Sequence, residues 1–213
     1  AGSSALYTNT TGGDNVAIGA DALLDATTGN RNTALGKSAG ANLTTGDDNT
    51  AIGRMALFTA TTISDTVAVG KNALYSMTTG AGNTAVGYEA GTTLTTAANT
   101  TAVGYEALTA LTTGNNNTAV GKEAAEATTT GTDNTAIGKG ALGANTTGTG
   151  NTAVGSSALD AVTTGLGNTA IGEDALGSNT GSYNSAFGRH ALYLNTTGDG
   201  LTAVGHQALQ ANT

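Results

Sequence analysis

The chain has 213 residues, of which only ten per cent are charged, and its formal net charge is −8. This acidic balance excludes the basic footprint of a nucleic-acid-binding protein, and the absence of cysteine excludes disulfide and thiolate-metal frameworks. No run of about eighteen apolar residues and no basic-then-apolar leader occurs, so neither a membrane span nor a signal peptide is predicted.

A five-residue motif recurs along the whole sequence, as NTALG at 32–36, NTAIG at 49–53 and NTAVG at 83–87. The spacing is seventeen residues throughout, except for sixteen between Gly172 and Gly188. Such a period indicates a solenoid. We therefore expect a single repeat domain over residues 1–213, with about twelve and a half coils. Because both ends fall in the middle of a coil, we expect this domain to be a segment of a longer fibrous protein.

Each coil is numbered here from position 1, the Asn of the motif, to position 17. Positions 2 to 5 alternate between two faces, as a short strand does. The expected strands, in chain order, are 16–19, 33–36, 50–53, 67–70, 84–87, 101–104, 118–121, 135–138, 152–155, 169–172, 185–188 and 202–205. A second turn at the Gly of position 15 leaves room for a second short strand in each coil.

The two faces of the strand differ in side-chain size. Position 4 is always apolar, whereas Ala at position 3 and Gly at position 5 make the other face almost flat, so that another backbone can approach it. We expect this flat face to pack in the core or between chains. Its residues include Ala17, Gly19, Ala34, Gly36, Ala51, Gly53, Ala85, Gly87, Ala119, Gly121, Ala153 and Gly155.

Stacking the coils at about 4.8 Å predicts a rod roughly 60 Å long, in which equal residues form rows. Asn at position 1 is expected to form a hydrogen-bonded ladder. Phe187 in the shortened coil suggests an enlarged core residue that compensates for the missing residue. A single roll would bury little apolar surface per residue, so we expect closed symmetry among several chains to supply more burial.

The motifs NTAVGxxAL and NVAIGADAL, the latter at 15–23, resemble the head repeats of trimeric autotransporter adhesins, and they are similar to repeats of phage tail fibres. The resemblance covers the whole chain. It implies a left-handed parallel β-roll in which three chains share one axis. The coil of seventeen residues with its TTG turn departs from the family pattern.

Charged and aromatic residues gather at positions 6 and 7, just after each strand. Their simplest interpretation is a solvated corner, but Tyr and Arg also anchor interfaces well. The candidate surface contacts are Tyr88, Glu89, Tyr105, Glu106, Arg189 and His190.

Other chemistries have weaker support in the sequence. His190 and His206 lie in neighbouring coils but lack further metal ligands, and the Asp residues of GDDN at 46–49 are expected to stabilise their own turn rather than bind Ca²⁺. The Thr pairs at positions 13 and 14 suggest an ice-binding ladder, but adjacent residues of a strand point to opposite faces. No insertion interrupts the coils to form a pocket, so we expect no enzyme, cofactor or metal.

The function that we predict is that of an extracellular, adhesive fibre segment, a phage tail fibre or a bacterial adhesin head. It would form a homotrimer, project from a virion or a cell, and present a repetitive surface to a host receptor or glycan, with no nucleic-acid partner and no membrane insertion. The alternatives are a subunit of a self-assembling extracellular filament and an ice-binding solenoid.

Overall fold

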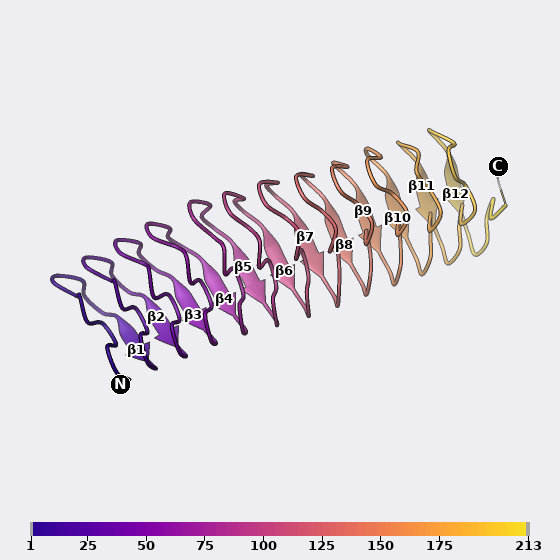
Figure 1. Ribbon diagram of the computed structural model, residues 1–213. Helices are drawn as coiled ribbons and strands as arrows, with labels where there is room; N and C mark the ends of the chain where they lie inside the picture. Colours follow the sequence, from indigo (N-terminus) through magenta and orange to yellow (C-terminus); the bar gives the residue numbers. More distant parts are fainter. Residues whose placement is uncertain (1, 212–213) are drawn as a thin grey trace.

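The structure, a computed structural model, describes residues 2–211 and is an all-β parallel solenoid. Twelve strands form one parallel sheet in chain order, and the coils stack into a rod with the first strand at one end and the last at the other (Figure 1). The strands are β1 (Val16–Ile18), β2 (Thr33–Leu35), β3 (Thr50–Ile52), β4 (Val67–Val69), β5 (Thr84–Val86), β6 (Thr101–Val103), β7 (Thr118–Val120), β8 (Thr135–Ile137), β9 (Thr152–Val154), β10 (Thr169–Ile171), β11 (Ser185–Phe187) and β12 (Thr202–Val204).

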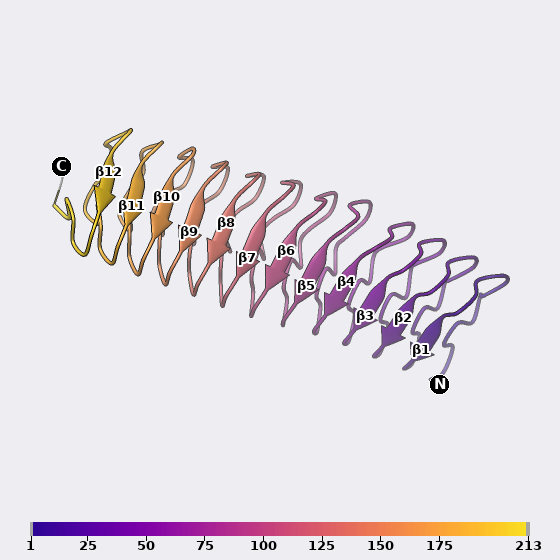
Figure 2. The same cartoon turned by 180° about the vertical axis from the view of Figure 1, so that it is seen from behind.

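The register of the sheet follows the repeat without a slip. Ala34 pairs with Ala51, and Thr169 pairs with Ser185 across the shortened coil. The predicted seventeen-residue coil and the predicted strand positions are therefore confirmed. Seen from behind, the strands keep this order from one end of the rod to the other (Figure 2).

The second strand that the sequence analysis expected in each coil is absent from residues 2–211. Its place is taken by turns, because positions 7 and 9 adopt a left-handed backbone, for example Asn72 at φ 58° and Leu74 at φ 49°. A non-glycine residue in this region costs about 1–2 kcal/mol. Complete burial of the Leu74 side chain offsets this cost, since burying a Leu contributes about 1.5–3 kcal/mol.

The inside of each coil is filled by small and medium side chains. Ala at positions 3 and 8 and Leu at position 9 are buried in almost every coil, as Ala85, Ala90 and Leu74 show. Where Gly40 and Gly91 replace the position-9 Leu, the side chains of Leu43 and Leu94 at position 12 are buried instead. In these two coils, the Leu at position 12 therefore fills the interior that the Leu at position 9 fills elsewhere.

Of the two places expected for the flat face of Ala and Gly, the core is the one that its Ala residues occupy, whereas the expectation of a core residue at position 4 is wrong. Ala at position 3 points into its own coil, whereas the apolar residue at position 4 points outward, as Ile18, which is 50% exposed, shows. Phe187 also points outward, so it does not compensate for the short coil from inside the core. The two walls of a coil lie so close together that Ala fits between them.

The Gly at position 5 does allow a close approach, but within the same chain. A Cβ added at Gly36, whose φ is +135°, would lie 2.7 Å from the carbonyl of Gly53 in the next coil. In the expected flat face, the Ala residues therefore line the inside of the coil, and the Gly residues let the backbones of adjacent coils approach each other.

No helix in the described part of the chain is long and apolar enough to cross a membrane.

Candidate functional site

The outer face of the sheet runs along the rod across all twelve strands. Each strand directs the residues at positions 2 and 4 outward, which are mostly Thr and Val or Ile. The position-4 side chains remain accessible, for example Leu35 at 45%, Ile137 at 41% and Ile171 at 42%. No charged residue occupies either row in any of the twelve strands. The face is therefore a continuous apolar and hydroxyl surface with no group that repels a second copy.

Two charged edges border this sheet face, and they are defined by the coil positions just outside each strand. The basic edge is position 6, which holds six of the seven Lys and Arg residues of the chain: Lys37, Arg54, Lys71, Lys122, Lys139 and Arg189. The acidic edge is position 17, which carries Asp14, Asp48, Asp65 and Asp133. All of these residues are exposed.

Tyr88 and Tyr105 interrupt the basic edge and stack on each other. Their ring centroids are 5.3 Å apart and their planes differ by 10°. Lys71 Nζ lies 4.9 Å from the Tyr88 ring centroid and Lys122 Nζ lies 5.6 Å from that of Tyr105, both in cation–π contact. The ring faces are thus occupied by neighbours, so a ligand would meet the ring edges and hydroxyl groups rather than an open aromatic platform.

The two Glu residues beside this stack take part in polar contacts of the chain itself. A hydrogen bond to Glu106, followed by the negative charge of that carboxylate, raises the pKa of the Tyr105 hydroxyl above its usual value. Glu89 Oε1 accepts a hydrogen bond from Asn72 Nδ2 at 3.2 Å. Tyr88, Glu89, Tyr105 and Glu106 therefore form one continuous patch, as their positions in adjacent coils suggest.

Arg189 and His190 lie five coils away, after β11, and do not join that patch. Arg189 Nε pairs with Glu173 Oε2 at 3.0 Å, and His190 Nε2 lies 3.3 Å from Asp174 Oδ2. The His190 ring packs against Tyr193 with a centroid distance of 5.2 Å. The six candidate contacts thus form two separate surface sites rather than one. Within residues 2–211, no three His, Cys, Asp or Glu side chains are grouped to hold a metal ion.

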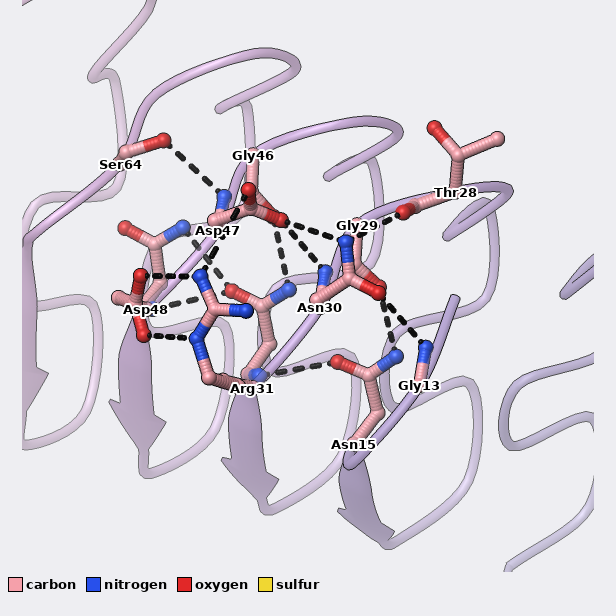
Figure 3. A network of polar contacts seen from close by, with 12 residues as sticks. Gly13, Asn15, Thr28, Gly29, Asn30, Arg31, Gly46, Asp47, Asp48 and Ser64 are labelled. Carbon is pink, nitrogen blue, oxygen red and sulfur yellow. Dashed lines mark hydrogen bonds and ion pairs between the residues drawn. The ribbon is translucent and has the colours of Figure 1, made fainter. Parts of the chain in front are cut away.

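The Asp residues of GDDN bond to the preceding coil rather than to their own turn (Figure 3). Asp47 Oδ1 accepts the backbone N–H of Asn30 at 2.7 Å, and Arg31 donates to both oxygens of Asp48, at 2.6 and 2.7 Å. The hydrogen bond from Arg31, together with its positive charge, holds the pKa of Asp48 below its usual value. These carboxylates therefore join coils together, which corrects the expectation of local turn stabilisation.

Position 1 carries the expected ladder of Asn side chains, which is confirmed where Asn residues succeed one another. Asn49 Nδ2 donates to Asn32 Oδ1 at 3.0 Å, and the same oxygen accepts the backbone N–H of Asn49 at 3.0 Å. Thr66 and Thr100 interrupt the row, but the N–H of each still donates to the Asn of the preceding coil. The ladder is buried and holds the sheet in register.

The Thr pairs of the TTG turn have two different environments. The first hydroxyl bonds to a carbonyl of the next coil, as Thr129 Oγ1 does to the Thr146 oxygen at 3.1 Å, whereas Thr130 is exposed. Within residues 2–211, the Thr row that lies on the sheet is that of position 2.

Comparison with protein-family models, with curated proteins and with solved structures gives no match for this chain.

Proposed function

We propose that this chain is a segment of a homotrimeric fibre that projects from a virion or a cell and presents a repetitive surface. The observation that supports it best is the uncharged sheet face, on which the position-4 apolar side chain is exposed in eight of the twelve strands and half-buried in the other four. Water contact with such a long apolar row is unfavourable, and contiguous apolar surfaces of this kind are typical of protein interfaces. The occupant that fits a face of constant repeat is a second copy with the same repeat.

Closed symmetry would bury this face around a central axis along the rod. Three rods would then turn their Thr and Val or Ile rows toward one another, and the TTG turns would face solvent. The outer surface would repeat each weak contact many times, so that avidity could exceed the affinity of a single contact. The Tyr88 and Tyr105 patch is the candidate for contact with a receptor or glycan.

The first experiment is light scattering on the purified chain, with the variant Ile137→Asp as a test of the face. We expect a molar mass three times that of the 20.5 kDa chain, and a single-chain mass for the variant. A wild-type chain that stays monomeric at high concentration would contradict the proposal. Binding to intact host cells, compared with a Tyr88→Ser, Tyr105→Ser variant, then separates an adhesive fibre from a filament that only assembles.

A second candidate, ice binding, is favoured by one observation. The sheet face carries a regular row of outward Thr residues at position 2, next to an apolar row, in stacked parallel strands. If this face remained free in solution, it could order water on its surface. Thermal hysteresis by the monomeric chain, lost in a Thr118→Lys, Thr135→Lys variant, would support this function over the fibre.

A further inference from the structure

At three strands, a carboxylate of the acidic edge and a cation of the basic edge lie at the same coil level. Asp65 precedes β4 and Lys71 follows it; Asp133 and Lys139 flank β8 in the same way. Asp48 and Arg54 flank β3. The two members of each pair are six residues apart and lie beyond opposite ends of an extended strand. The two residues of a pair do not form an ion pair with each other, because six extended residues span up to about 20 Å.

The pairing of the two edges is incomplete. Asp14 is level with Ala20. Lys122 and Arg189 are level with the uncharged Asn116 and Tyr183.

At two further levels, those of Tyr88 and Tyr105, neither edge carries a charge. Gly82 and Asn99 precede the strands that Tyr88 and Tyr105 follow, so that a small or uncharged residue is level with each large ring. Glu173, the one acidic residue at position 6, is level with Gly167 rather than with an Asp. Carboxylates of the two edges are therefore never level with each other.

Several of these charges have no ion-pair partner of their own. Among residues 2–211, Arg54, Lys139 and Asp65 form no ion pair within the chain. The one like-charged pair, Arg31 with Lys37, is different, because both oxygens of Asp48 already bind the Arg31 side chain and Asp47 lies 3.9 Å from it. Because these two carboxylates neutralise Arg31, position 17 of this coil carries little net positive charge.

Symmetry decides which edges meet when copies pack through the sheet face. Around an axis parallel to the rod, the basic edge of each chain abuts the acidic edge of its neighbour, at the same coil level. In an antiparallel pair, by contrast, the basic edge meets the basic edge, and coils from opposite ends become level. Like charges directly opposite each other are destabilising, so only the parallel arrangement is electrostatically favourable.

We propose that the two charged edges fix the direction and the register of the assembly, through level contacts of Asp65 and Asp133 with Lys71 and Lys139 of a neighbouring copy. This inference rests on the proposed self-association through the sheet face. The apolar rows would supply the attraction but would permit either direction and any shift by whole coils, because every coil presents nearly the same face. The charged edges favour one direction and one register over these alternatives.

The test is a set of charge reversals with residues that the same coil positions already hold. One variant reverses the acidic edge (Asp65→Arg, Asp133→Arg), one reverses the basic edge (Lys71→Glu, Lys139→Glu), and a third combines all four changes. Arg31 at position 17 has φ 57°, close to 56° at Asp65 and 58° at Asp133, so Arg fits that backbone. Glu173 shows that a carboxylate fits position 6.

We expect each single-edge variant to raise the concentration of half-dissociation about tenfold in low salt, because several surface contacts of a few tenths of a kcal/mol become repulsive together. The combined variant should return to the wild-type value. A control with Glu126→Lys and Asp160→Lys, which changes the net charge by the same amount as the acidic-edge reversal at exposed sites away from the sheet, should associate as the wild type does.

The outcomes separate this inference from the proposed function. If the wild type is monomeric, both fail. If the wild type associates but neither single-edge variant weakens it, the face assembles without the edges and this inference is overturned. If both single-edge variants weaken association and the combined variant does not recover, the edges matter but are not level, and the parallel register is overturned.

Discussion

Asn168 is bonded to Asn151 of the preceding coil at two atoms. Its backbone N–H and its side-chain Nδ2 both donate to Asn151 Oδ1, at 3.0 and 3.1 Å. Asn151 Nδ2 in turn donates to the Gly165 carbonyl at 2.8 Å. One fully buried side chain therefore satisfies the N–H of Asn168, which directly precedes β10, and the carbonyl of the turn at Gly165.

Replacing this side chain should destabilise the solenoid. Asn151→Ala leaves the buried N–H of Asn168 and the Gly165 carbonyl without partners, and we expect a loss of about 2–4 kcal/mol in the free energy of unfolding. Urea denaturation measures the loss, and hydrogen exchange at the Asn168 amide shows where it arises. Asn151→Thr should show a similar loss, because the hydroxyl groups of Thr66 and Thr100 at this position donate to Ser64 and Ala98 of their own turn rather than to the next coil. Unchanged stability in both variants would show that the ladder bonds contribute nothing.

Neighbouring residues of one strand should respond oppositely to a charge. Ala136 is buried in the coil and Ile137 lies on the sheet face. We expect Ala136→Asp to unfold the coils around β8, because an unpaired charge in the interior is costly. Ile137→Asp should leave the circular dichroism spectrum of the β-solenoid unchanged. Unfolding by Ile137→Asp, or tolerance of Ala136→Asp, would contradict the assignment of the two faces.

The row of Gly residues at position 5 predicts a steric effect of substitution that backbone strain alone does not cause. Gly121 has φ +140°, and an added Cβ would lie 2.5 Å from the Gly138 oxygen. Gly121→Ala should therefore cost about 2–4 kcal/mol, as strain and overpacking act together. Gly150→Ala is the control, because its φ is +68° but its nearest neighbours are 4.0 Å away. Its cost, measured by the same denaturation, should be about 1 kcal/mol.

The Arg31 contact predicts a pH dependence with a definite sign. Since the pKa of Asp48 is lowered in the folded chain, the contact stabilises the fold above the unfolded pKa of about 3.9, and this contribution is lost as the pH falls through the folded value. NMR titration of the Asp48 carboxyl should give a pKa below the usual value. Arg31→Gln should return it toward that value while leaving the pKa of Asp133, which Asn116 and Thr132 lower, unchanged.

The sequence by itself determined the solenoid, the seventeen-residue coil, the strand positions and the Asn ladder. It could do so because every coil needs the same shape as its neighbours, so the residues that bond coil to coil recur at a fixed interval. The rows at Asn32, Ala34 and Gly36 need only this regularity to be recognised. The Tyr88 and Tyr105 stack follows from the same regularity, since equal positions in adjacent coils must lie side by side.

Only the tertiary structure decided which face of the strand is inside. Alternation tells two faces apart but does not orient them, and Val or Ile is usually the buried partner of an alternating pair. Here the opposite wall of the coil is so near that Ala85 fills the space, and Val86 is left on the surface. The level charges of Asp65 and Lys71 became meaningful only then, because they border a surface whose exposure depends on how tightly one coil closes on itself.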